Sequence, residues 1–521
     1  MSFDYTAVAN RIWRTNKTTG AKTQIVVRGL SWFGCETETA CPHGLWSVSM
    51  NSVLTSVQKY GFNALRVPFS CDFVTTRDQA PTSINYAANP GLQGLSRIRV
   101  LDALIAACAE RGILVMLDMH RLDSNSISEM WYDGTHAEAQ VIAAWQTIAA
   151  RYAKCDNILA HDLRNEVHGR CDWGSGSLTT DWRLAAQRIA NAVLAVSPNP
   201  LIFVEGLDRS NPASPTTDNA FWAENVSFAM TMPVKVRVAN KVVYSPHTYG
   251  SDVHDQPQFS APNFPSNLRA GWQAKYGVLV DAPYNQTVVV GEFGSKYAQG
   301  SKDEIIQNQL AAFLKDKKIG AFLWALNCNG SDTAGFLMDD WTTVNARYAS
   351  LAAAAVPTPT ALGKMLCPIA TAPVPVPAPT PTPTPTPAPA PVPAPVPTPP
   401  PAPTPTPAPT PSPAGQVMAT VTRTNVWTDA GVTMQQFDVT LTHHEATSVR
   451  SAVIQLDVPS ALVKQAWSVV PITTVPVTGK AFFGLPSWLT QYGWPASSPF
   501  KFGVVVATSV PLTASCVIQA A

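Results

Sequence analysis

The stretch "ILAHDLRNEVHG", residues 158–169, changes character halfway along its length. Ile158 and Leu163 belong to an apolar run that predicts a buried strand, whereas Asn165 and Glu166 follow directly at its far end. Burying a carboxylate without a partner is costly, so a strand that only fills a core does not end in this way. The stretch therefore predicts a strand whose far end reaches a functional site.

Apolar runs of strand length recur on both sides of this stretch, with helical patterns such as residues 95–112 and 138–153 between them. The eight predicted strands are residues 24–32, 63–70, 113–120, 157–166, 201–206, 242–250, 287–293 and 319–327. Eight such repeats predict an α/β fold, the (β/α)8 or TIM barrel, with its helices outside. A doubly wound open sheet is the alternative, but no glycine-rich phosphate loop follows the first strand.

A proline-rich segment, residues 371–415, divides the chain. It carries no charge, and proline lacks a backbone donor, so we expect an extended Pro/Thr-rich linker. Its threonines favour an O-glycosylated, extracellular stalk over a ligand for a proline-recognising domain, which would usually carry basic residues. The predicted domains are thus the barrel at 1–370, the linker, and a small all-β sandwich at 416–521, where apolar and polar residues alternate.

The composition narrows the class of partner. The 521 residues carry a formal net charge of +1 without charged runs, which argues against nucleic acid and anionic membranes. Only 14% of residues are charged while 15 are tryptophan, which suits a flat, uncharged ligand such as a sugar. No transmembrane helix is predicted, and the first residues, "MSFDYTAVANRIWR", do not resemble a signal peptide. We expect a monomer.

The nine cysteines cannot all pair within the chain. Cys35 with Cys41 could close one loop, and Cys155 with Cys171 could close another around the opening stretch. Their spacings match no zinc motif, so neither a metal site nor a cofactor is expected.

Polar and aromatic residues collect at the ends of the predicted strands. They are Arg66, His120, Asn165, Glu166, Glu205, His247, Tyr249, Glu292 and Trp324. In a (β/α)8 barrel these ends converge on one face. Glycosidic bond cleavage needs two carboxyl groups with different pKa values, one neutral and one ionised. Arg66 is expected to keep one glutamate ionised, while the other is repelled by that charge and holds its proton longer.

The motifs "RGLSWFG", "HGLW", "NALRVPFS", "LDMH", "DLRNE", "YSPHTYG", "VVVGEFG" and "WALNCNGSDTAGFL" closely resemble glycoside hydrolase family 5, particularly its cellulase branch. The resemblance covers about residues 24–351. It implies a (β/α)8 barrel and retaining hydrolysis of cellulose or a related β-1,4-glucan, with Glu166 as acid/base and Glu292 as nucleophile. One departure is Val167, which stands where the family usually has a proline. Because proline makes the turn after the acid/base rigid, its absence could loosen Glu166 slightly.

The same resemblance implies roles for the neighbouring residues. Arg66 and Tyr249 would orient Glu292, Asn165 would bind the sugar 2-hydroxyl, and Trp324 would form the floor beneath that sugar. The remaining candidates are His120 and His247 for sugar hydroxyls and the acid/base, His43 and Trp46 for extending the cleft, and Asp332 for a further sugar contact. Glu205 is left out of the catalytic pair and is expected to support the site or to contact substrate.

The last predicted domain resembles carbohydrate-binding module family 49, chiefly through "LPSWL" and the strand after it. Its candidates for a cellulose-stacking platform are Trp467, Trp488, Tyr492 and Trp494, of which at least one is expected to be a core residue instead. The chain is thus expected to be a secreted endo-β-1,4-glucanase with a tethered cellulose-binding module. Alternatives are the same chemistry on mannan, xyloglucan or mixed-linkage glucan, or a non-catalytic cellulose-binding structural protein.

Overall fold

The structure is a computed structural model that divides the chain into two compact units, residues 1–383 and 384–521. It describes residues 2–125, 127–209, 220–369, 417–429, 432–443, 449–467, 469–472, 480–485, 494, 500–508 and 512–518. The predicted linker, residues 371–415, lies wholly outside the described residues, so the domain limits at 370/371 and 415/416 stay predictions. Within the described part of the chain, no helix is long and apolar enough to span a membrane.

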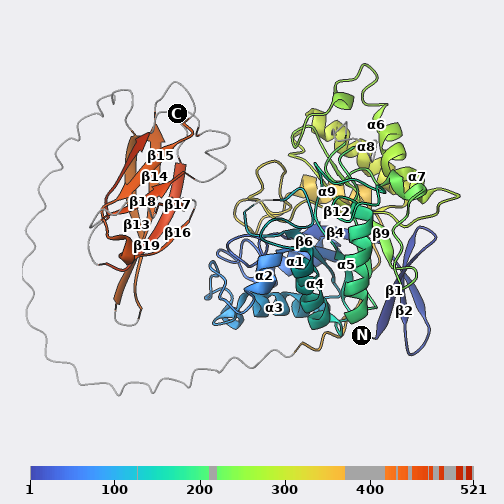
Figure 1. Ribbon diagram of the computed structural model, residues 1–521, viewed down its shortest axis with the longest axis horizontal. Coiled ribbons are helices and arrows are strands. Elements are labelled where there is room, and N and C mark those ends of the chain that lie inside the picture. Colours follow the sequence, from blue (N-terminus) through green and yellow to red (C-terminus); the bar gives the residue numbers. More distant parts are fainter. Residues whose placement is uncertain are drawn as a thin grey trace, which may run out of the picture. The chain divides into compact units, whose positions relative to one another are not determined.

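A closed parallel barrel forms the first unit (Figure 1). Its strands are β4 (Arg28–Ser31), β5 (Ala64–Ser70), β6 (Leu114–Arg121), β7 (Ile158–Asp162), β8 (Leu201–Val204), β9 (Val242–Tyr244), β10 (His247–Tyr249), β11 (Val289–Gly294) and β12 (Gly320–Leu323). Neighbours in the sheet follow chain order, β12 pairs with β4, and a parallel bridge from Tyr244 to Val288 closes the ring. The predicted barrel is confirmed, except that the sixth predicted strand is divided into β9 and β10 around Pro246, which has no N–H for the ladder.

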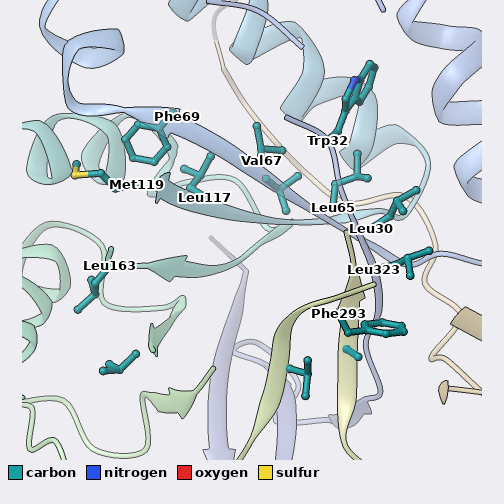
Figure 2. Close-up of a cluster of buried hydrophobic side chains, with 14 of the residues drawn as sticks. Leu30, Trp32, Leu65, Val67, Phe69, Leu117, Met119, Leu163, Phe293 and Leu323 are labelled. Carbon is teal, nitrogen blue, oxygen red and sulfur yellow. The ribbon is translucent and has the colours of Figure 1, made fainter. Parts of the chain in front are cut away.

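Helices cover the outside of this sheet. They are α1 (Met50–Lys59), α2 (Cys71–Thr75), α3 (Arg97–Glu110), α4 (Glu138–Tyr152), α5 (Trp182–Val196), α6 (Leu268–Trp272), α7 (Val278–Val280), α8 (Lys302–Lys317) and α9 (Ala346–Ala355). Side chains alternate between the two faces of a strand. Leu65, Val67 and Phe69 pack in the core shared with the helices (Figure 2). Arg66 points the other way, to the carboxylates inside the barrel.

The barrel interior changes from apolar to polar along each strand. On β6 the inward residues are Leu114 and Met116, which belong to an apolar cluster, followed by Asp118 and His120, which form a hydrogen-bonded pair. Period-two alternation brings these four side chains to one face. The lower barrel is therefore a packed core, and the carboxyl ends of the strands hold the charged groups.

A three-stranded antiparallel sheet that the sequence did not predict covers the other end of the barrel. It comprises β1 (Phe3–Val8), β2 (Arg11–Asn16) and β3 (Lys22–Ile25), so the run expected as one strand at 24–32 is divided between this sheet and β4. Tyr5 and Ile12 join the apolar cluster of the lower barrel. Buried Lys241 donates to the Tyr5 carbonyl at 2.6 Å, which fixes the sheet to the barrel.

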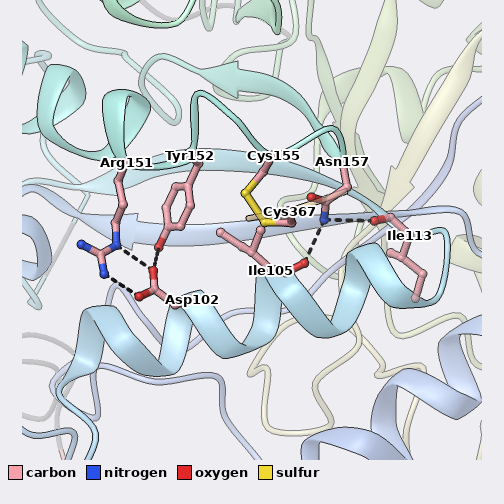
Figure 3. Close-up of a disulfide and its surroundings, with 8 residues drawn as sticks. All are labelled: Asp102, Ile105, Ile113, Arg151, Tyr152, Cys155, Asn157 and Cys367. Carbon is pink, nitrogen blue, oxygen red and sulfur yellow. Dashed lines mark hydrogen bonds and ion pairs between the residues drawn. A yellow bond between two sulfur atoms is a disulfide. The ribbon is translucent and has the colours of Figure 1, made fainter. Parts of the chain in front are cut away.

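The disulfide of the first unit joins Cys155 to Cys367, so both pairings considered from the sequence are wrong (Figure 3). Cys35, Cys41 and Cys171 are free thiols. Cys155 lies just before β7 whereas Cys171 lies beyond the opposite end of that strand. The segment after α9 instead returns to the base of β7, where the Asp156 N–H donates to the carbonyl of Leu366 at 2.7 Å and brings Cys367 beside Cys155.

The second unit contains two antiparallel sheets. Their strands are β13 (Val417–Asp429), β14 (Val432–His443), β19 (Phe500–Val506) and β16 (Val463–Trp467) in one, and β17 (Val470–Pro471), β18 (Ala481–Gly484), β15 (Ala452–Leu456) and β20 (Ala514–Ile518) in the other. One apolar cluster contains residues of both sheets, for example Phe502 and Ile454. Phe483, Leu485 and Phe502 are buried in this cluster.

Candidate active site

Arg66, at the centre of the barrel mouth, organises the polar side chains that follow the strands. Its side chain is fully buried. Its nitrogens lie close to five polar groups: Asn165 Oδ1 at 2.9 Å, Asp118 Oδ2 at 3.0 Å, Asp162 Oδ2 at 3.2 Å, Glu205 Oε1 at 3.3 Å and Glu292 Oε1. These groups come from strands or strand ends spread around the barrel, which explains why their burial together is tolerated: one guanidinium supplies donors to all of them.

Glu292 on β11 is held by two direct hydrogen bonds. Arg66 donates to Oε1 and the Tyr249 hydroxyl donates to Oε2. Burial raises the pKa of Glu292 to about 7, while the charges of His247 and Arg66 and the hydrogen bond from Tyr249 act in the opposite direction. The carboxyl group is thus fixed in orientation and titrates near neutral pH.

Glu166 follows β7 in a left-handed backbone conformation, with φ of 50°. Its backbone N–H donates to Glu205 Oε2 at 2.6 Å, and its Oε1 lies 3.0 Å from His247 Nδ1. Its side chain is 13% exposed, against 3% for Glu292, so it faces the open side of the mouth. Ligand-type atoms of Glu166, His247 and Glu292 all lie within 4.8 Å of one another.

The two glutamates titrate in the opposite order from the one expected. Burial would raise the pKa of Glu166, but the hydrogen bond and charge of His247 outweigh it and lower that pKa. Burial would lower the pKa of His247, but Glu205, Glu292 and Glu166 raise it well above its usual value. Arg66 does lower the pKa of Glu292, but burial raises that pKa by more, so the net shift is upward. The order depends on His247, whose position between three carboxylates the sequence does not show.

Aromatic rings line the mouth next to the carboxylates. Trp324, after β12, is nearly parallel to His120 at 5.2 Å between ring centroids and to Phe33 at 5.4 Å. His120 is buried, and burial followed by the charge of Arg66 lowers its pKa well below its usual value, so the ring is neutral. His43 contacts Phe33 and also Trp46, whose side chain is 38% exposed. These rings form one continuous aromatic surface.

The amide of Asn165 and the carboxyl group of Asp332 complete the candidates for contacting a ligand at the mouth. The Nδ2 of Asn165 is buried and has no hydrogen-bond partner among the described residues, so a donor is available beside Glu166. Asp332 is half-buried; burial raises its pKa, and the charge of Glu166 does so as well. All eleven barrel residues singled out from the sequence therefore lie on the mouth side, and the structure also brings Glu205 into contact with Glu166.

Sequence reasoning did not single out Asp118, Asp162 or Trp222 in this region. Asp118 and Asp162 lie on the inward face, two positions before His120 and four before Glu166, and period-two alternation along the strands could have found them. Trp222 stacks on His168 at 3.7 Å between centroids and is 42% exposed, in a loop without any periodic pattern.

Among the residues that the structure describes, two groups of side chains have the geometry to hold a metal ion: Asp162, Glu205 and His247, and Glu166, His247 and Glu292. Arg66 contacts Asp162, Glu205 and Glu292 directly, and both nitrogens of His247 lie near carboxylates. The positive charge that compensates these carboxylates thus comes from the protein itself.

Of the aromatic candidates in the second unit, the structure describes the side chain of Trp494. Trp494 is 1% exposed and packs edge-on against His443 at 4.5 Å and against Phe500 at 5.8 Å. It is a core residue, and its assignment to a cellulose-stacking platform is wrong, because a buried ring presents no face to a fibre. Trp467 belongs to β16, but its side chain lies outside the described residues, as do Trp488 and Tyr492 altogether.

Known proteins resemble the first unit closely. The profile of the family described as cellulase (glycosyl hydrolase family 5) matches residues 18–330. An endoglucanase from Paenibacillus polymyxa is 42% identical over 318 residues, 61% of this chain and 79% of the relative. The major extracellular endoglucanase of Xanthomonas campestris pv. campestris is 40% identical over 322 residues, 61% of this chain and 65% of the relative.

Solved structures of cellulases also resemble the first unit. A cellotetraose complex of the endocellulase from Pyrococcus horikoshii superposes with a TM-score of 0.65 at 36% identity, covering 68% of this chain and 99% of that one. The catalytic domain of the Xanthomonas campestris endoglucanase gives a TM-score of 0.63 at 37% identity, covering 68% of this chain and 100% of that one.

Proposed function

This chain belongs to glycosyl hydrolase family 5, the cellulases, and from that premise we propose that it is a retaining endo-β-1,4-glucanase. The observation that carries the proposal is the pair Glu166 and Glu292, with carboxylate oxygens within 4.8 Å of each other at the barrel mouth. Retaining enzymes hold their two carboxyl groups about 5–5.5 Å apart, because one of them attacks the sugar directly. The names of the relatives as endoglucanases, and the cellotetraose complex of one of them, support β-1,4-glucan as the substrate.

In the first step, Glu292 attacks the anomeric carbon and Glu166 protonates the departing glycosidic oxygen. Arg66 and Tyr249 hold Glu292 in the orientation for attack. Asn165 is the donor for the 2-hydroxyl of the attacked sugar, an interaction that strengthens in the transition state. Trp324 supplies the floor beneath that sugar.

In the second step, ionised Glu166 takes a proton from water, and the resulting hydroxide displaces Glu292 from the sugar. Glu166 regains in this step the proton it gave in the first, so the cycle balances. The reaction requires the proton on Glu166 and not on Glu292. His247 lies 3.0 Å from Glu166 and 3.7 Å from Glu292, so it is the group through which the proton reaches Glu166 in the free enzyme.

The other mouth residues extend the cleft. His43 and Trp46 serve sugars further along the chain, His120 binds a hydroxyl, and Asp332 makes an additional contact from the last loop. Glu205 supports the turn that carries Glu166. Contacts at the mouth support the assignments of His43, Trp46, His120 and Glu205, and Asp332 is assigned from its position in the loop after β12.

A direct test is the release of reducing sugar from carboxymethylcellulose, compared with mannan and xyloglucan. We expect the highest rate on carboxymethylcellulose, with a rapid fall in viscosity that marks internal cleavage, and none from Glu292→Gln. Proton NMR should show the β-anomer as the first product. A preference for mannan or xyloglucan would move the substrate to another β-glycan, and an α-anomer as the first product would rule out the retaining mechanism.

We further propose that the protein is secreted as a monomer, with a barrel domain at 1–370, a linker at 371–415 and a cellulose-binding β-sandwich module at 416–521. The two antiparallel sheets with one shared apolar cluster support the sandwich. The Cys155–Cys367 disulfide and the name of the extracellular Xanthomonas relative support secretion. Trp467, Trp488 and Tyr492 remain the candidates for stacking on cellulose.

A further inference from the structure

An exposed tryptophan lies on the Glu166 side of the barrel mouth. Trp222, in the loop after β8, is 42% exposed, whereas its neighbours Phe221 and Ala223 are buried. One face of its ring lies flat on His168, with 3.7 Å between ring centroids and 3° between ring planes. Because His168 covers that face, the exposed surface of the indole lies on the side away from it. The ring thus offers an apolar surface that a ligand can reach.

The loop holds Trp222 in place from both directions along the chain. On one side of it, Phe221 packs edge-on against Tyr249, at 5.9 Å between ring centroids. On the other side, Asn225 and Leu207 exchange two backbone hydrogen bonds, of 2.9 and 3.0 Å. The indole is therefore a fixed platform at the mouth and not the tip of an unanchored loop.

His168 connects this platform to the turn that carries Glu166. Its Nδ1 lies 2.7 Å from the backbone carbonyl of Glu166, and because a carbonyl only accepts, Nδ1 is the donor. The backbone N–H of His168 donates to the carbonyl of Glu129 at 2.9 Å. Since Glu205 accepts the N–H of Glu166, side chains hold both the N–H and the carbonyl of this residue, whose φ is positive. A displacement of the His168 ring would therefore disturb the turn that carries Glu166.

Trp222 lies across the mouth from the aromatic surface that includes Trp46. The strands follow chain order around the ring, and with β9 and β10 counted as one, Trp46 follows the first strand and Trp222 the fifth of eight. The two loops are therefore on opposite sides. The acid/base of a glycosidase protonates the departing oxygen, so the departing part of the glucan lies on the side of Glu166. That is the side on which Trp222 lies.

We propose that the exposed face of Trp222 binds a glucose unit of the leaving group, and that His168 beneath it is a positioning residue that links this sugar to the orientation of Glu166. A pyranose presents an apolar C–H face that suits a fixed indole ring. A sugar on Trp222 would press the indole onto His168 and so steady the carbonyl side of the turn. The inference rests on the proposed function, because a leaving group exists only where the glucan is cleaved.

Two substitutions separate the hydrogen bond of His168 from its ring. His168→Phe keeps a ring beneath Trp222 but has no donor for the Glu166 carbonyl, whereas His168→Asn keeps a donor near the position of Nδ1 but has no ring. The readout is kcat/KM on two substrates: cellopentaose, whose leaving group is a sugar that needs a proton, and dinitrophenyl cellobioside, whose leaving group needs none.

His168→Phe should lose about tenfold on cellopentaose and nothing on dinitrophenyl cellobioside, because the nucleophile Glu292 is unaffected. A general disturbance of the fold would lower both values. The control is Leu178→Ala, at a 69% exposed apolar position in the loop after β7, which should change neither value. Equal losses on both substrates in His168→Phe, or no loss on either, would overturn the positioning role.

The platform is tested by KM for cellopentaose. Trp222→Ala and His168→Asn should both raise it by about threefold to tenfold, since one removes the stacking ring and the other its support, and Trp222→Phe should restore most of the affinity. Trp222→Ala alters an exposed side chain, so it also covers the case in which the His168 variants fail to fold. An unchanged KM in Trp222→Ala would exclude a sugar on this ring.

The same measurements distinguish this inference from the proposed function. Failure of the wild type to hydrolyse both carboxymethylcellulose and dinitrophenyl cellobioside would overturn the proposed function. An active wild type whose KM for cellopentaose does not respond to Trp222→Ala would overturn the inference about Trp222 and His168 alone.

Discussion

The carboxylate of Glu205 accepts a hydrogen bond from the backbone N–H of Glu166, at 2.6 Å. Glu166 has a positive φ, a conformation that residues with a side chain adopt at a cost, so the turn needs an external partner. Glu205 supplies that partner, and its other oxygen lies 3.3 Å from Arg66 and 3.2 Å from His247. Val167, which stands where the family usually has proline, is fully buried and packs the same turn into the core.

Glu205→Gln should therefore lower activity by disturbing the turn that carries Glu166, the proposed acid/base, and not by removing a contact with the substrate. Both oxygens of Glu205 face donors, so glutamine must turn an NH₂ group toward one of them. Loss of a charge-assisted hydrogen bond of about 1.5–3 kcal/mol should lower kcat by about tenfold to a hundredfold. The measurement is kcat and KM on soluble cello-oligosaccharides, with Glu110→Gln at an exposed position as control. Unchanged kcat would show that the turn holds without Glu205.

Glutamine substitutions of Glu292 and Glu166 should block different steps of the reaction. Glu292→Gln should form no glycosyl-enzyme, because an amide is a poor nucleophile. Glu166→Gln should lose at least about a hundredfold on cellulose but still form the intermediate from a dinitrophenyl cellobioside, whose leaving group needs no proton. Mass spectrometry of the trapped intermediate distinguishes the two variants. Interchanged behaviour would reverse the assignment of nucleophile and acid.

Activity should decline as pH falls below about 7, because the nucleophile must be ionised and the pKa of Glu292 is raised to about 7. The Tyr249 hydrogen bond lowers that pKa, so Tyr249→Phe should raise it and shift the acidic limb of kcat/KM to higher pH. Profiles from pH 4 to 9 on a soluble substrate measure both effects, with Tyr132→Phe as control. An acidic limb that shifts to lower pH in Tyr249→Phe would contradict this account of the site.

Removing the disulfide should destabilise the barrel without altering its chemistry. Cys155 and Cys367 are 212 residues apart, so the bridge restricts a very long loop in the unfolded chain. The double substitution of both cysteines by alanine should lower stability by about 2–4 kcal/mol and leave kcat unchanged at moderate temperature. Thermal unfolding with and without reductant is the measurement: reductant should lower the Tm of the wild type toward that of the variant. Equal Tm values for both proteins would mean that the bridge adds no stability.

Truncation after residue 370 should reduce binding to solid cellulose without reducing the turnover of soluble oligosaccharides. A tethered module raises the local concentration of the barrel at the fibre without changing its active site. Hydrolysis of soluble oligosaccharides should stay the same while binding to microcrystalline cellulose falls.

Within the full chain, Trp488→Ala should weaken this binding with the module still folded, whereas Trp494→Ala should unfold the module, since Trp494 is buried. A truncated protein that binds cellulose as well as the full chain would exclude a cellulose-binding role for the second unit.

The barrel and the residues at its mouth could be predicted because they obey local periodicities. Glu166 and Glu292 stand at the ends of apolar runs, and parallel strands carry such ends to one face whatever the intervening loops do. The sheet β1–β3 escaped prediction because its short strands are mostly half-buried and lack a clear alternation. Pro246 divided an expected strand because it has no N–H for the ladder, and a proline inside a predicted strand could have indicated this break.

Other features depend on neighbours that are distant in sequence. Cys155 finds Cys367 only when the segment after α9 returns to the base of β7. The pKa order of the two glutamates follows from His247, which meets both across the mouth. Trp494 illustrates a different limit: an aromatic residue in a small β domain suits a core and a binding face equally well, and burial alone distinguishes them.

The Cys155–Cys367 bridge also bears on how the protein withstands mechanical load. Cys367 lies four positions before the proline-rich segment begins at residue 371, and Cys155 precedes β7 at the end of the barrel opposite the mouth. Tension along that segment would reach the barrel at the covalent bridge, and α9 would be spared from peeling away from the sheet. A barrel pulled along a fibre would thus be held from its closed base, with its mouth unobstructed by the point of attachment.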